Sequence, residues 1–336
     1  MLLVTSCGPA VSAATPSTRA NGVKATVVPS LGCERGIVVP VQQTLPFSAA
    51  GDDGSYLEQA PTTGTPARPL PVVFDFHGYQ ETGPSQEAVT GLGAYGLTHG
   101  FVTVTPWIND EPVPLWVSSV GSRDLAWFGQ FLTHVEETTC VDQNRVFVTG
   151  YSNGAFMSSA IACEYSARVA AVAPVAGLQA MSPCKMTRPV PVVAFHGTGD
   201  PVVHYNGTPS KAALNLPAPD GSHRAMSPNE ERQFGTKGIF TKGPTVAQQA
   251  ATWARRSGCS STVTRTTVTR DTTRLTWSCP HHADVDLYRI AGGGHTWPGS
   301  QALVGASSLL GRTSLTLSAD AVIWDFFLAH PRTASD

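Results

Sequence analysis

The stretch RVFVTGYSNGAFMSSAIAC, from Arg145 to Cys163, decides the fold of this chain. Its first part is rich in strand-forming residues, and its last part is typical of a buried helix. Between the two lies Gly-Tyr-Ser-Asn-Gly, a Gly-x-Ser-x-Gly pattern centred on Ser152. The two glycines allow a strand and a helix to approach closely around a sharp turn. We therefore predict a strand–turn–helix unit that exposes the hydroxyl of Ser152.

A serine hydroxyl becomes a nucleophile only with a base beside it and donors for the developing oxyanion. In folds with this turn, the partners follow in the chain order serine, acid, histidine. Asp200 in AFHGTGDPVV and His295 in AGGGHTWPG occur in that order, each after a β-rich segment. The alternatives are a turn aspartate in Thr-Gly-Asp-Pro and a surface-loop histidine. We predict that Ser152, Asp200 and His295 form a catalytic triad.

Two backbone amides are expected to bind the oxyanion. The amide of Asn153 opens the helix after the nucleophile and points toward that position. The second amide is expected from the loop DFHGYQETG, either from Tyr79 or, alternatively, from Gln80. We expect His77 in this loop, and His196 in the similar FHGTG, to hold their loops in place through their rings.

Three aromatic residues lie next to these motifs, namely Trp107, Tyr151 and Trp297. Parallel sheets bind ligands at the carboxyl ends of their strands, so we predict that these side chains bind the substrate. Core packing is the alternative for each of them. Together they favour an apolar or aromatic acyl group over a charged substrate.

The segment HHADVD contains His281, His282, Asp284 and Asp286, which are residue types that bind zinc. Adjacent histidines on a strand point to opposite faces, so His281 and His282 cannot share a site there. We therefore do not expect a metal site in this segment.

The alternation of apolar runs with longer helical patterns predicts an α/β fold with a mostly parallel central sheet and helices on both faces. The predicted strands cover residues 71–78, 101–106, 145–150, 169–177, 190–197 and 286–294. The predicted helices cover residues 87–99, 123–139, 153–165, 245–257 and 318–329. Residues 261–279 alternate Val, Thr and Leu with Arg and Thr, which predicts an antiparallel hairpin at the sheet edge.

Composition and charge limit the possible partners. Of the 336 residues 41% are hydrophobic and only 14% are charged, so a large core lies beneath a thinly charged surface, as in a secreted protein. The net charge is −2, and the longest basic cluster is Arg255-Arg256, so nucleic acid is not an expected partner. We expect a monomer that acts on an ester, polymeric or oligomeric.

Residues 33–336 are predicted to form one catalytic domain that contains a long loop at 205–243, near the mouth of the site. Residues 1–32 are interpreted as a truncated signal and a weakly ordered tether. The sequence VTSC before residue 8 fits a lipoprotein cleavage site, so Cys7 is the predicted lipid anchor, with an accidental free thiol as the alternative. The other six cysteines are expected to form disulfides, with Cys259–Cys279 the first pair across the hairpin.

The ordered motifs HG, CVDQNRVFVTGYSNGAFMSSAIAC, APVAG, FHGTGDPVVHYNG and GGGHTWPG resemble the polyhydroxybutyrate depolymerase and feruloyl esterase group, which is related to carbohydrate esterase family one. The resemblance implies a bacterial α/β-hydrolase, secreted or attached to the cell envelope, that needs no metal or cofactor. By matching position it assigns the triad to Ser152, Asp200 and His295, and the oxyanion amides to Tyr79 and Asn153.

These observations predict a serine esterase that hydrolyses hydroxyalkanoate or feruloyl-type esters through an acyl-enzyme. The alternatives are an acyltransferase of the same fold and a non-catalytic cell-envelope lipoprotein that binds a polymer. The loop HGYQETG departs from the glycine run of the family, which leaves the substrate open.

Overall fold

The computed structural model describes residues 26–35, 41–62, 68–109, 112–222, 224, 227, 229–230, 242–280 and 282–333. Most of the predicted tether, with Cys7, lies outside the described residues, as do His281 and part of the loop at 205–243.

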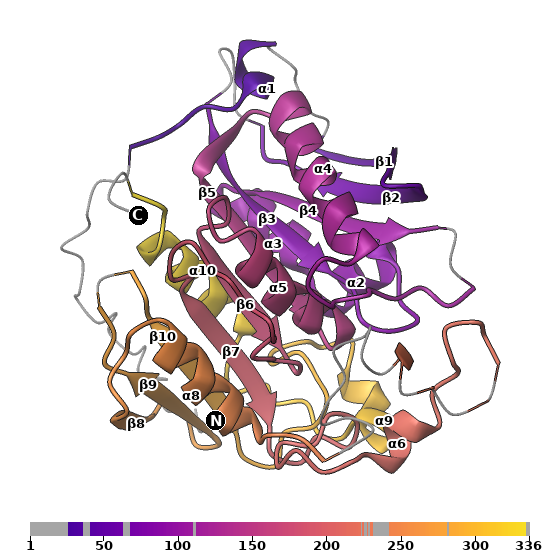
Figure 1. The fold of residues 1–336 in the computed structure, drawn as a ribbon, viewed down its shortest axis with the longest axis vertical. Coiled ribbons are helices and arrows are strands. Elements are labelled where there is room, and N and C mark those ends of the chain that lie inside the picture. Colours follow the sequence, from indigo (N-terminus) through magenta and orange to yellow (C-terminus); the bar gives the residue numbers. More distant parts are fainter. Residues whose placement is uncertain are drawn as a thin grey trace, which may run out of the picture.

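A ten-stranded sheet runs through the molecule in the order β1-β2-β4-β3-β5-β6-β7-β10-β9-β8 (Figure 1). The strands are β1 (Gln42–Ala49), β2 (Asp52–Gln59), β3 (Leu70–Phe76), β4 (Val102–Ile108), β5 (Val141–Tyr151), β6 (Ala171–Val175), β7 (Val192–Gly197), β8 (Val263–Thr267), β9 (Thr272–Trp277) and β10 (Val285–Ile290). Strands β4, β3, β5, β6, β7 and β10 pair in parallel, whereas both ends of the sheet are antiparallel. This confirms the predicted mostly parallel sheet, and the hairpin β8–β9 lies at its edge.

The helices are α1 (Leu31–Glu34), α2 (Gly83–Thr90), α3 (Leu92–His99), α4 (Arg123–Thr138), α5 (Asn153–Glu164), α6 (Lys211–Leu214), α8 (Val246–Arg256), α9 (Ser307–Leu310) and α10 (Ala319–Ala329), with a 3₁₀ turn η1 (Val304–Ala306). Alternate residues of a strand point to opposite faces. On β5, Val146 and Val148 pack in the core that contains α4, α5 and α8, whereas Phe147 packs on the other face. There its ring stacks on Phe327 of α10 at 4.5 Å. Helices therefore cover both faces, as predicted.

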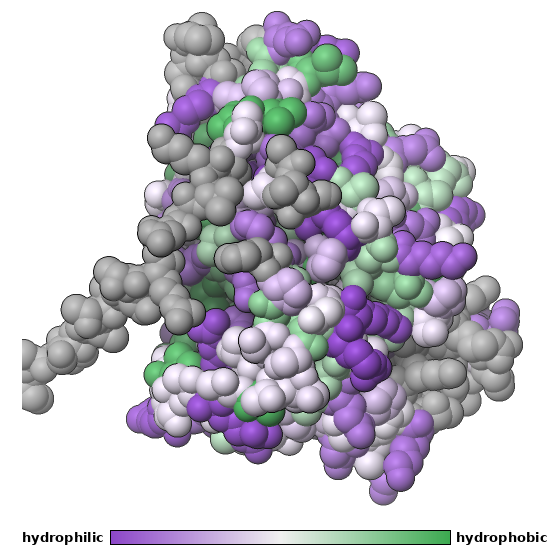
Figure 2. Space-filling model, turned by 60° about the vertical axis from the view of Figure 1, so that its left-hand side comes forward, coloured by the Kyte–Doolittle hydropathy of each residue, from purple (hydrophilic) through white to green (hydrophobic). Residues whose placement is uncertain are grey.

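On the face shown in Figure 2, the described hydrophobic residues form small separate groups among hydrophilic and neutral ones. No described helix has the length and the hydropathy needed to cross a bilayer.

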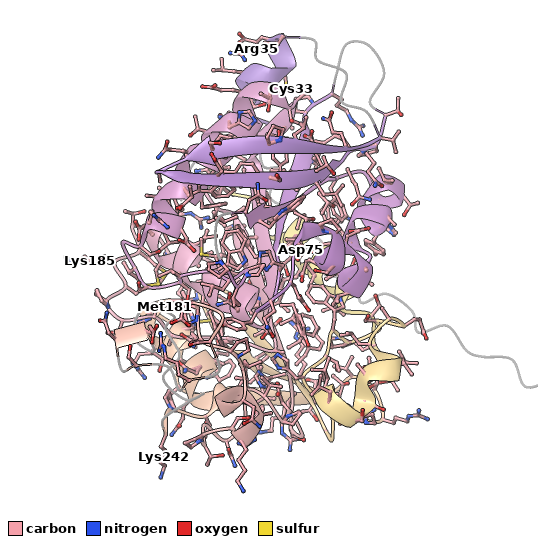
Figure 3. All side chains as sticks on the ribbon, turned by 90° about the vertical axis from the view of Figure 1, so that its right-hand side faces the viewer. Cys33, Arg35, Asp75, Met181, Lys185 and Lys242 are labelled. Atoms are coloured by element: carbon pink, nitrogen blue, oxygen red, sulfur yellow. A yellow bond between two sulfur atoms is a disulfide. The ribbon has the colours of Figure 1, made fainter. Side chains whose placement is uncertain are left out.

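A carboxyl group is buried in the sheet. Asp75 of β3 lies inside the molecule, whereas Lys185 and Lys242 lie at its periphery (Figure 3). The Oδ1 atom of Asp75 accepts a hydrogen bond from Gln86 Nε2 at 2.7 Å, and Asp75 Oδ2 accepts one from Thr90 Oγ1 at 2.9 Å. Burial raises the pKa of Asp75 well above its usual value. The side chain therefore joins β3 to α2 through two hydrogen bonds.

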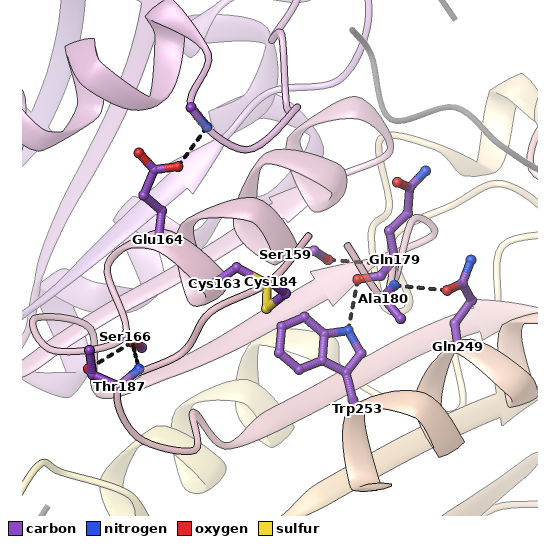
Figure 4. The surroundings of a disulfide bond; sticks show 11 residues. Ser159, Cys163, Glu164, Ser166, Gln179, Ala180, Cys184, Thr187, Gln249 and Trp253 are labelled. Atoms are coloured by element: carbon purple, nitrogen blue, oxygen red, sulfur yellow. Dashed lines mark hydrogen bonds between the residues drawn. A yellow bond between two sulfur atoms is a disulfide. The ribbon is translucent and has the colours of Figure 1, made fainter. Parts of the chain in front are cut away.

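Three disulfides join the described residues: Cys33–Cys140, Cys163–Cys184 and Cys259–Cys279. The last confirms the predicted pairing across the hairpin. Around the second disulfide, the indole of Trp253 in α8 donates to Gln179 O at 2.8 Å (Figure 4). The bond and this contact fix the segment after β6 between α5 and α8.

Two elements differ from the predictions made from the sequence. The hairpin β1–β2 was not predicted, because its strands contain many polar residues and β1 alternates between exposed and half-buried positions. The helix predicted over 87–99 is two helices, since Gly91 between them has a φ of 68°. A left-handed residue of this kind ends a helix.

The domain also begins before the predicted boundary near Cys33. The amide of Val28 donates to Asp142 Oδ1 at 2.9 Å, and Ser30 Oγ donates to Thr139 O at 2.8 Å. Residues 26–32, which the sequence analysis assigned to the tether, therefore pack against β5 and the end of α4.

Candidate active site

The turn around Ser152 is strained and tightly enclosed. Ser152 lies between β5 and α5 with φ 55° and ψ −113°, a conformation that non-glycine residues rarely adopt. A Cβ on Gly154 would lie 2.0 Å from Phe76 O, and one on Gly150 would lie 2.4 Å from Gly154 O. Only glycine fits at these two positions, which explains the Gly-x-Ser-x-Gly pattern.

Glycines also bring the histidine and the aspartate together. A Cβ on Gly197 would lie 2.2 Å from Gly293 O, so the loops after β7 and β10 meet backbone to backbone. The amide of Gly199 donates to the same Gly293 O at 2.8 Å. Because β5, β7 and β10 are parallel, their carboxyl ends lie at one edge of the sheet. The three predicted triad residues each follow one of these strands.

The imidazole of His295 bridges the other two side chains. Its Nδ1 lies 2.8 Å from Asp200 Oδ2, and its Nε2 lies 2.8 Å from Ser152 Oγ. An ionised carboxylate only accepts hydrogen bonds, so Nδ1 carries the hydrogen and Nε2 can accept the serine proton. The geometry allows a proton to pass from Ser152 to His295.

The carboxylate of Asp200 is held by several donors. Its Oδ1 accepts hydrogen bonds from the amides of Val202 and Val203, both at 2.8 Å. Burial alone would raise the pKa of Asp200, but the imidazoles of His295 and His196 outweigh burial and hold it well below its usual range. Asp200 is therefore ionised at neutral pH and can stabilise a protonated His295.

Tyr151 does not occupy the predicted substrate-binding position. Its side chain is buried, and its hydroxyl donates to the main-chain O of His295 at 2.5 Å. Burial, with smaller effects of Glu81 and Asp200, raises the pKa of Tyr151 well above its usual value, so the hydroxyl keeps its proton. Tyr151 ties the backbone of His295 to the strand that carries Ser152.

The two tryptophans predicted to bind substrate are also packing residues. Trp297 is fully buried, and its indole Nε1 donates to Asp320 Oδ1 of α10 at 2.8 Å, so it cannot reach a substrate. Trp107 is half-buried at the end of β4, where its ring lies against Gly83 at the start of α2. The prediction is thus wrong for Tyr151 and Trp297, which are buried in the fold, whereas for the half-buried Trp107 it stays a prediction.

Two backbone amides are candidates for the predicted oxyanion hole. The amide of Asn153 is the first of α5, where helix geometry provides no backbone acceptor. The amide of Gln80 is engaged, since it donates to Pro114 O at 2.8 Å, which favours Tyr79 for the second donor. The side chain of Asn153 also fixes the neighbouring loop, with Oδ1 accepting from the Trp116 amide at 2.6 Å and Nδ2 donating to Trp116 O at 3.0 Å.

Glu81, which the sequence analysis did not single out, closes the loop that carries Tyr79. Its Oε2 accepts a hydrogen bond from the Gly78 amide at 2.9 Å. Burial raises the pKa of Glu81, an effect that Gly78 and the nearby His295 partly offset. His77 is fully buried, and its Nδ1 lies 2.7 Å from Gly78 O. Both side chains therefore hold the loop that carries Tyr79.

The described part of the long loop lies beside the site. The hydroxyl of Tyr79 donates a hydrogen bond to Pro217 O at 2.7 Å, and Ala213 of α6 packs against Phe156 of α5. These contacts join residues 205–222 to the loop that carries Tyr79 and to α5, the helix after Ser152.

The two acidic side chains of the HHADVD segment, Asp284 and Asp286, are used in other contacts. Asp284 Oδ2 lies 2.7 Å from His330 Nε2, and Asp286 pairs with Arg274 at 2.7 Å. Within the described ranges, no group of His, Cys, Asp and Glu side chains could hold a metal ion.

A strained serine between a strand and a helix, with a His–Asp pair at the ends of neighbouring parallel strands, is the arrangement of the α/β-hydrolase fold. Known proteins that are similar to this chain agree with that class. The acetyl xylan esterase from Aspergillus awamori superposes with a TM-score of 0.53 at 14% identity, over 85% of this chain and 99% of that one. The chain therefore has the predicted α/β-hydrolase fold.

The curated relatives bear names of carboxylic ester hydrolases. Feruloyl esterase D of Neurospora crassa is 28% identical over 215 residues, which are 61% of this chain and 68% of the relative. Feruloyl esterase B of Piromyces equi is 28% identical over 69% of this chain and 40% of its own length. Poly(3-hydroxyalkanoate) depolymerase C of Paucimonas lemoignei is 32% identical over 34% of this chain and 29% of its own length.

No protein-family model matches the chain. The relatives and the fold are nevertheless those of the carbohydrate esterase and polyhydroxybutyrate depolymerase group, which confirms the resemblance of the motifs. The chain spans less than half the length of the Piromyces and Paucimonas relatives.

Proposed function

We propose that the protein is a serine esterase that hydrolyses carboxylic esters through an acyl-enzyme. The observation that carries this proposal is the bridge made by His295, with Ser152 Oγ and Asp200 Oδ2 each 2.8 Å from its ring. A hydroxyl, a base and a fixed carboxylate in this order are the components of acyl transfer.

In the first half of the reaction, Ser152 Oγ attacks the ester carbonyl carbon while His295 Nε2 takes the serine proton. The amides of Tyr79 and Asn153 donate hydrogen bonds to the oxyanion. When the tetrahedral intermediate collapses, the C–O bond to the alcohol breaks, and His295 returns the proton to the leaving alkoxide. Asp200 stabilises the imidazolium throughout, and it stays ionised.

In the second half, water replaces the alcohol. His295 Nε2 takes a proton from the water as its oxygen attacks the acyl carbon, and the second intermediate forms in the same oxyanion site. Its collapse breaks the bond to Ser152 Oγ, which regains the proton, and the carboxylic acid leaves.

The replacement Ser152→Ala tests the proposal. We expect turnover of a short p-nitrophenyl ester to fall by about 10⁴-fold or more, with the fold intact by circular dichroism. Ser257→Ala is the matched control, since Ser257 is the residue that follows α8, and its buried hydroxyl has no hydrogen-bond partner among the described residues. A fluorophosphonate probe should label the wild type and Ser257→Ala but not Ser152→Ala. Retained turnover in Ser152→Ala rejects the assignment.

For the natural substrate we propose a hydroxyalkanoate oligomer or polyester, or a feruloyl-type ester. The names of the relatives support both classes. Rates on hydroxybutyrate oligomers, methyl ferulate and acetylated xylan distinguish the classes. Preference for the acetylated sugar over both of the others contradicts this part of the proposal.

We also propose that the protein works in an oxidising compartment, secreted or attached to the cell envelope. The three disulfides support this, since such bonds persist outside the reducing cytosol. Fractionation of expressing cells, with thiol titration of the recovered protein, tests the location. Recovery of reduced protein from the cytosol contradicts it.

A further inference from the structure

The carboxylate of Asp200 has two imidazole neighbours rather than one. Its Oδ2 lies 2.8 Å from His295 Nδ1 and 3.2 Å from Nε2 of His196, which lies near the end of β7. The side chain of His196 is 1% exposed, so water does not compete for this contact. The proposed triad therefore continues to a fourth side chain, which does not touch the reacting atoms.

The position of the hydrogen on His196 follows from its contacts. Its Nε2 also lies 2.8 Å from Val203 O. A carbonyl oxygen and a carboxylate oxygen only accept hydrogen bonds, so Nε2 must carry the hydrogen and share it between Val203 O and Asp200 Oδ2. The other nitrogen, Nδ1, is buried without a hydrogen-bond partner among the described residues. His196 is thus a donor toward Asp200.

Four donors then fix the acid from both sides. The amides of Val202 and Val203 hold Oδ1, while the two imidazoles hold Oδ2. A second donor on Oδ2 withdraws charge from the oxygen that faces His295 and limits the rotation of the carboxylate. Through both effects, His196 changes how strongly Asp200 holds and orients His295.

We propose that His196 is a positioning residue that orients Asp200 and reduces its basicity toward His295. This inference rests on the proposed esterase function. The competing explanation is that His196 only fastens the turn from β7 to Val203. A fastening role changes stability, whereas control of Asp200 also changes the pH dependence of the reaction.

Other titratable and charged groups lie around Asp200 and His196. Among the described residues they include His295 with the nearby Glu81, Tyr151 on β5, Tyr205 beside the His196 ring, and Arg289 over the ring of Tyr205. The variants below leave all five unchanged, so a shift in the pH profile reports the Asp200–His295 pair.

The test replaces His196 by Leu, which lacks a donor, and by Gln, whose amide can donate from a similar place. Initial rates with a soluble p-nitrophenyl ester are measured from about pH 5 to pH 9. In His196→Leu we expect kcat to fall about tenfold with KM within about twofold. The acid limb of kcat/KM should move upward by about half a pH unit, because Asp200 without this donor stabilises the imidazolium more strongly.

His196→Gln should return both kcat and the acid limb most of the way to the wild type. An acid limb that stays in place in His196→Leu overturns the proposal, as does a His196→Gln profile equal to that of His196→Leu.

A second measurement does not depend on the folding of a variant or on activity. In ¹⁵N-histidine spectra of the resting wild type, His196 should carry its hydrogen on Nε2, with Nδ1 unprotonated. A hydrogen on Nδ1 contradicts the inference. Absence of esterase activity in the wild type, with this tautomer present, would instead reject the proposed function.

Discussion

Tyr151 donates a hydrogen bond from its phenolic hydroxyl to the main-chain O of His295 at 2.5 Å. This contact joins the residue just before Ser152, the proposed nucleophile, to a residue 144 positions later in the chain. The distance of 2.8 Å between Ser152 Oγ and His295 Nε2 therefore depends on a contact made by the backbone of the histidine as well as by its ring.

The first prediction concerns this contact. Tyr151→Phe removes only the hydroxyl, so we expect kcat for a p-nitrophenyl ester to fall about tenfold, because the base is less well placed. The lost hydrogen bond should also lower the free energy of unfolding by about 1–2 kcal/mol. Steady-state kinetics and urea unfolding measure the two effects.

Tyr165→Phe is the matched control for this experiment, since Tyr165 donates to Leu125 O at 2.6 Å, on another part of the fold. It should lose stability but keep kcat. Equal kcat in Tyr151→Phe and the wild type would show that the contact does not position His295.

The sequence predicts the convergence of Ser152, Asp200 and His295 because short local motifs determine it. Each residue follows a buried parallel strand, and a glycine beside each one marks a close backbone contact. The roles of Tyr151 and Trp297 could not be predicted in the same way. Their polar atoms bond to partners far along the chain, and an aromatic residue beside a motif gives no sign of where its hydroxyl or indole points.

The difference between local motifs and long-range contacts also explains the errors in the predicted fold. The central strands are apolar on both faces and can be identified locally. The hairpin β1–β2 has Gln, Asp and Glu in its strands, and its place in the sheet depends on pairing with β4. The contacts of residues 26–32 with Asp142 and Thr139 are likewise non-local. The sequence of this segment alone therefore led to its interpretation as a tether.

The second prediction concerns Glu81 in the loop that carries Tyr79. Glu81→Gln retains an acceptor for the Gly78 amide but removes a negative charge near His295. The imidazolium of His295 loses that stabilisation, so we expect the acid limb of kcat/KM to move to lower pH. This is opposite in sign to the shift expected for His196→Leu. A pH–rate profile with a soluble ester measures it.

Glu87→Gln is the control, because the carboxylate of Glu87 accepts from the Gly93 and Ala94 amides at the start of α3. Its acid limb should match the wild type. A shift to higher pH in Glu81→Gln, or equal shifts in both variants, would contradict the assigned effect of Glu81.

The third prediction ranks the disulfides. Cys33–Cys140 spans 107 residues, whereas Cys259–Cys279 spans 20. A crosslink restricts the unfolded chain more when its loop is longer, by about 4.7 kcal/mol for 100 residues and about 3 kcal/mol for 15. Replacing Cys33 and Cys140 by Ala should therefore lower the free energy of unfolding more than replacing Cys259 and Cys279. Urea unfolding of the two double variants measures this, and the reverse order would contradict it.

The last prediction concerns Asp320, which accepts the indole hydrogen of Trp297. Burial raises the pKa of Asp320 to about 6, although the bond from Trp297 lowers it and Glu87 raises it further. The folded protein thus holds this proton at a pH where the unfolded chain has released it. The contribution of Asp320 to stability is fully present below about pH 4 and is lost as the pH rises through about 6.

Asp320→Asn keeps an acceptor for Trp297 but cannot ionise. Between about pH 4 and pH 7, the free energy of unfolding of this variant should therefore fall less than that of the wild type, by up to about 2–3 kcal/mol. Urea unfolding across this range measures the difference. Asp325→Asn, an exposed position on the same helix, should follow the wild-type curve. Parallel curves for the wild type and Asp320→Asn would mean that the folded protein does not retain the Asp320 proton, and that the indole of Trp297 bonds to an ionised carboxylate.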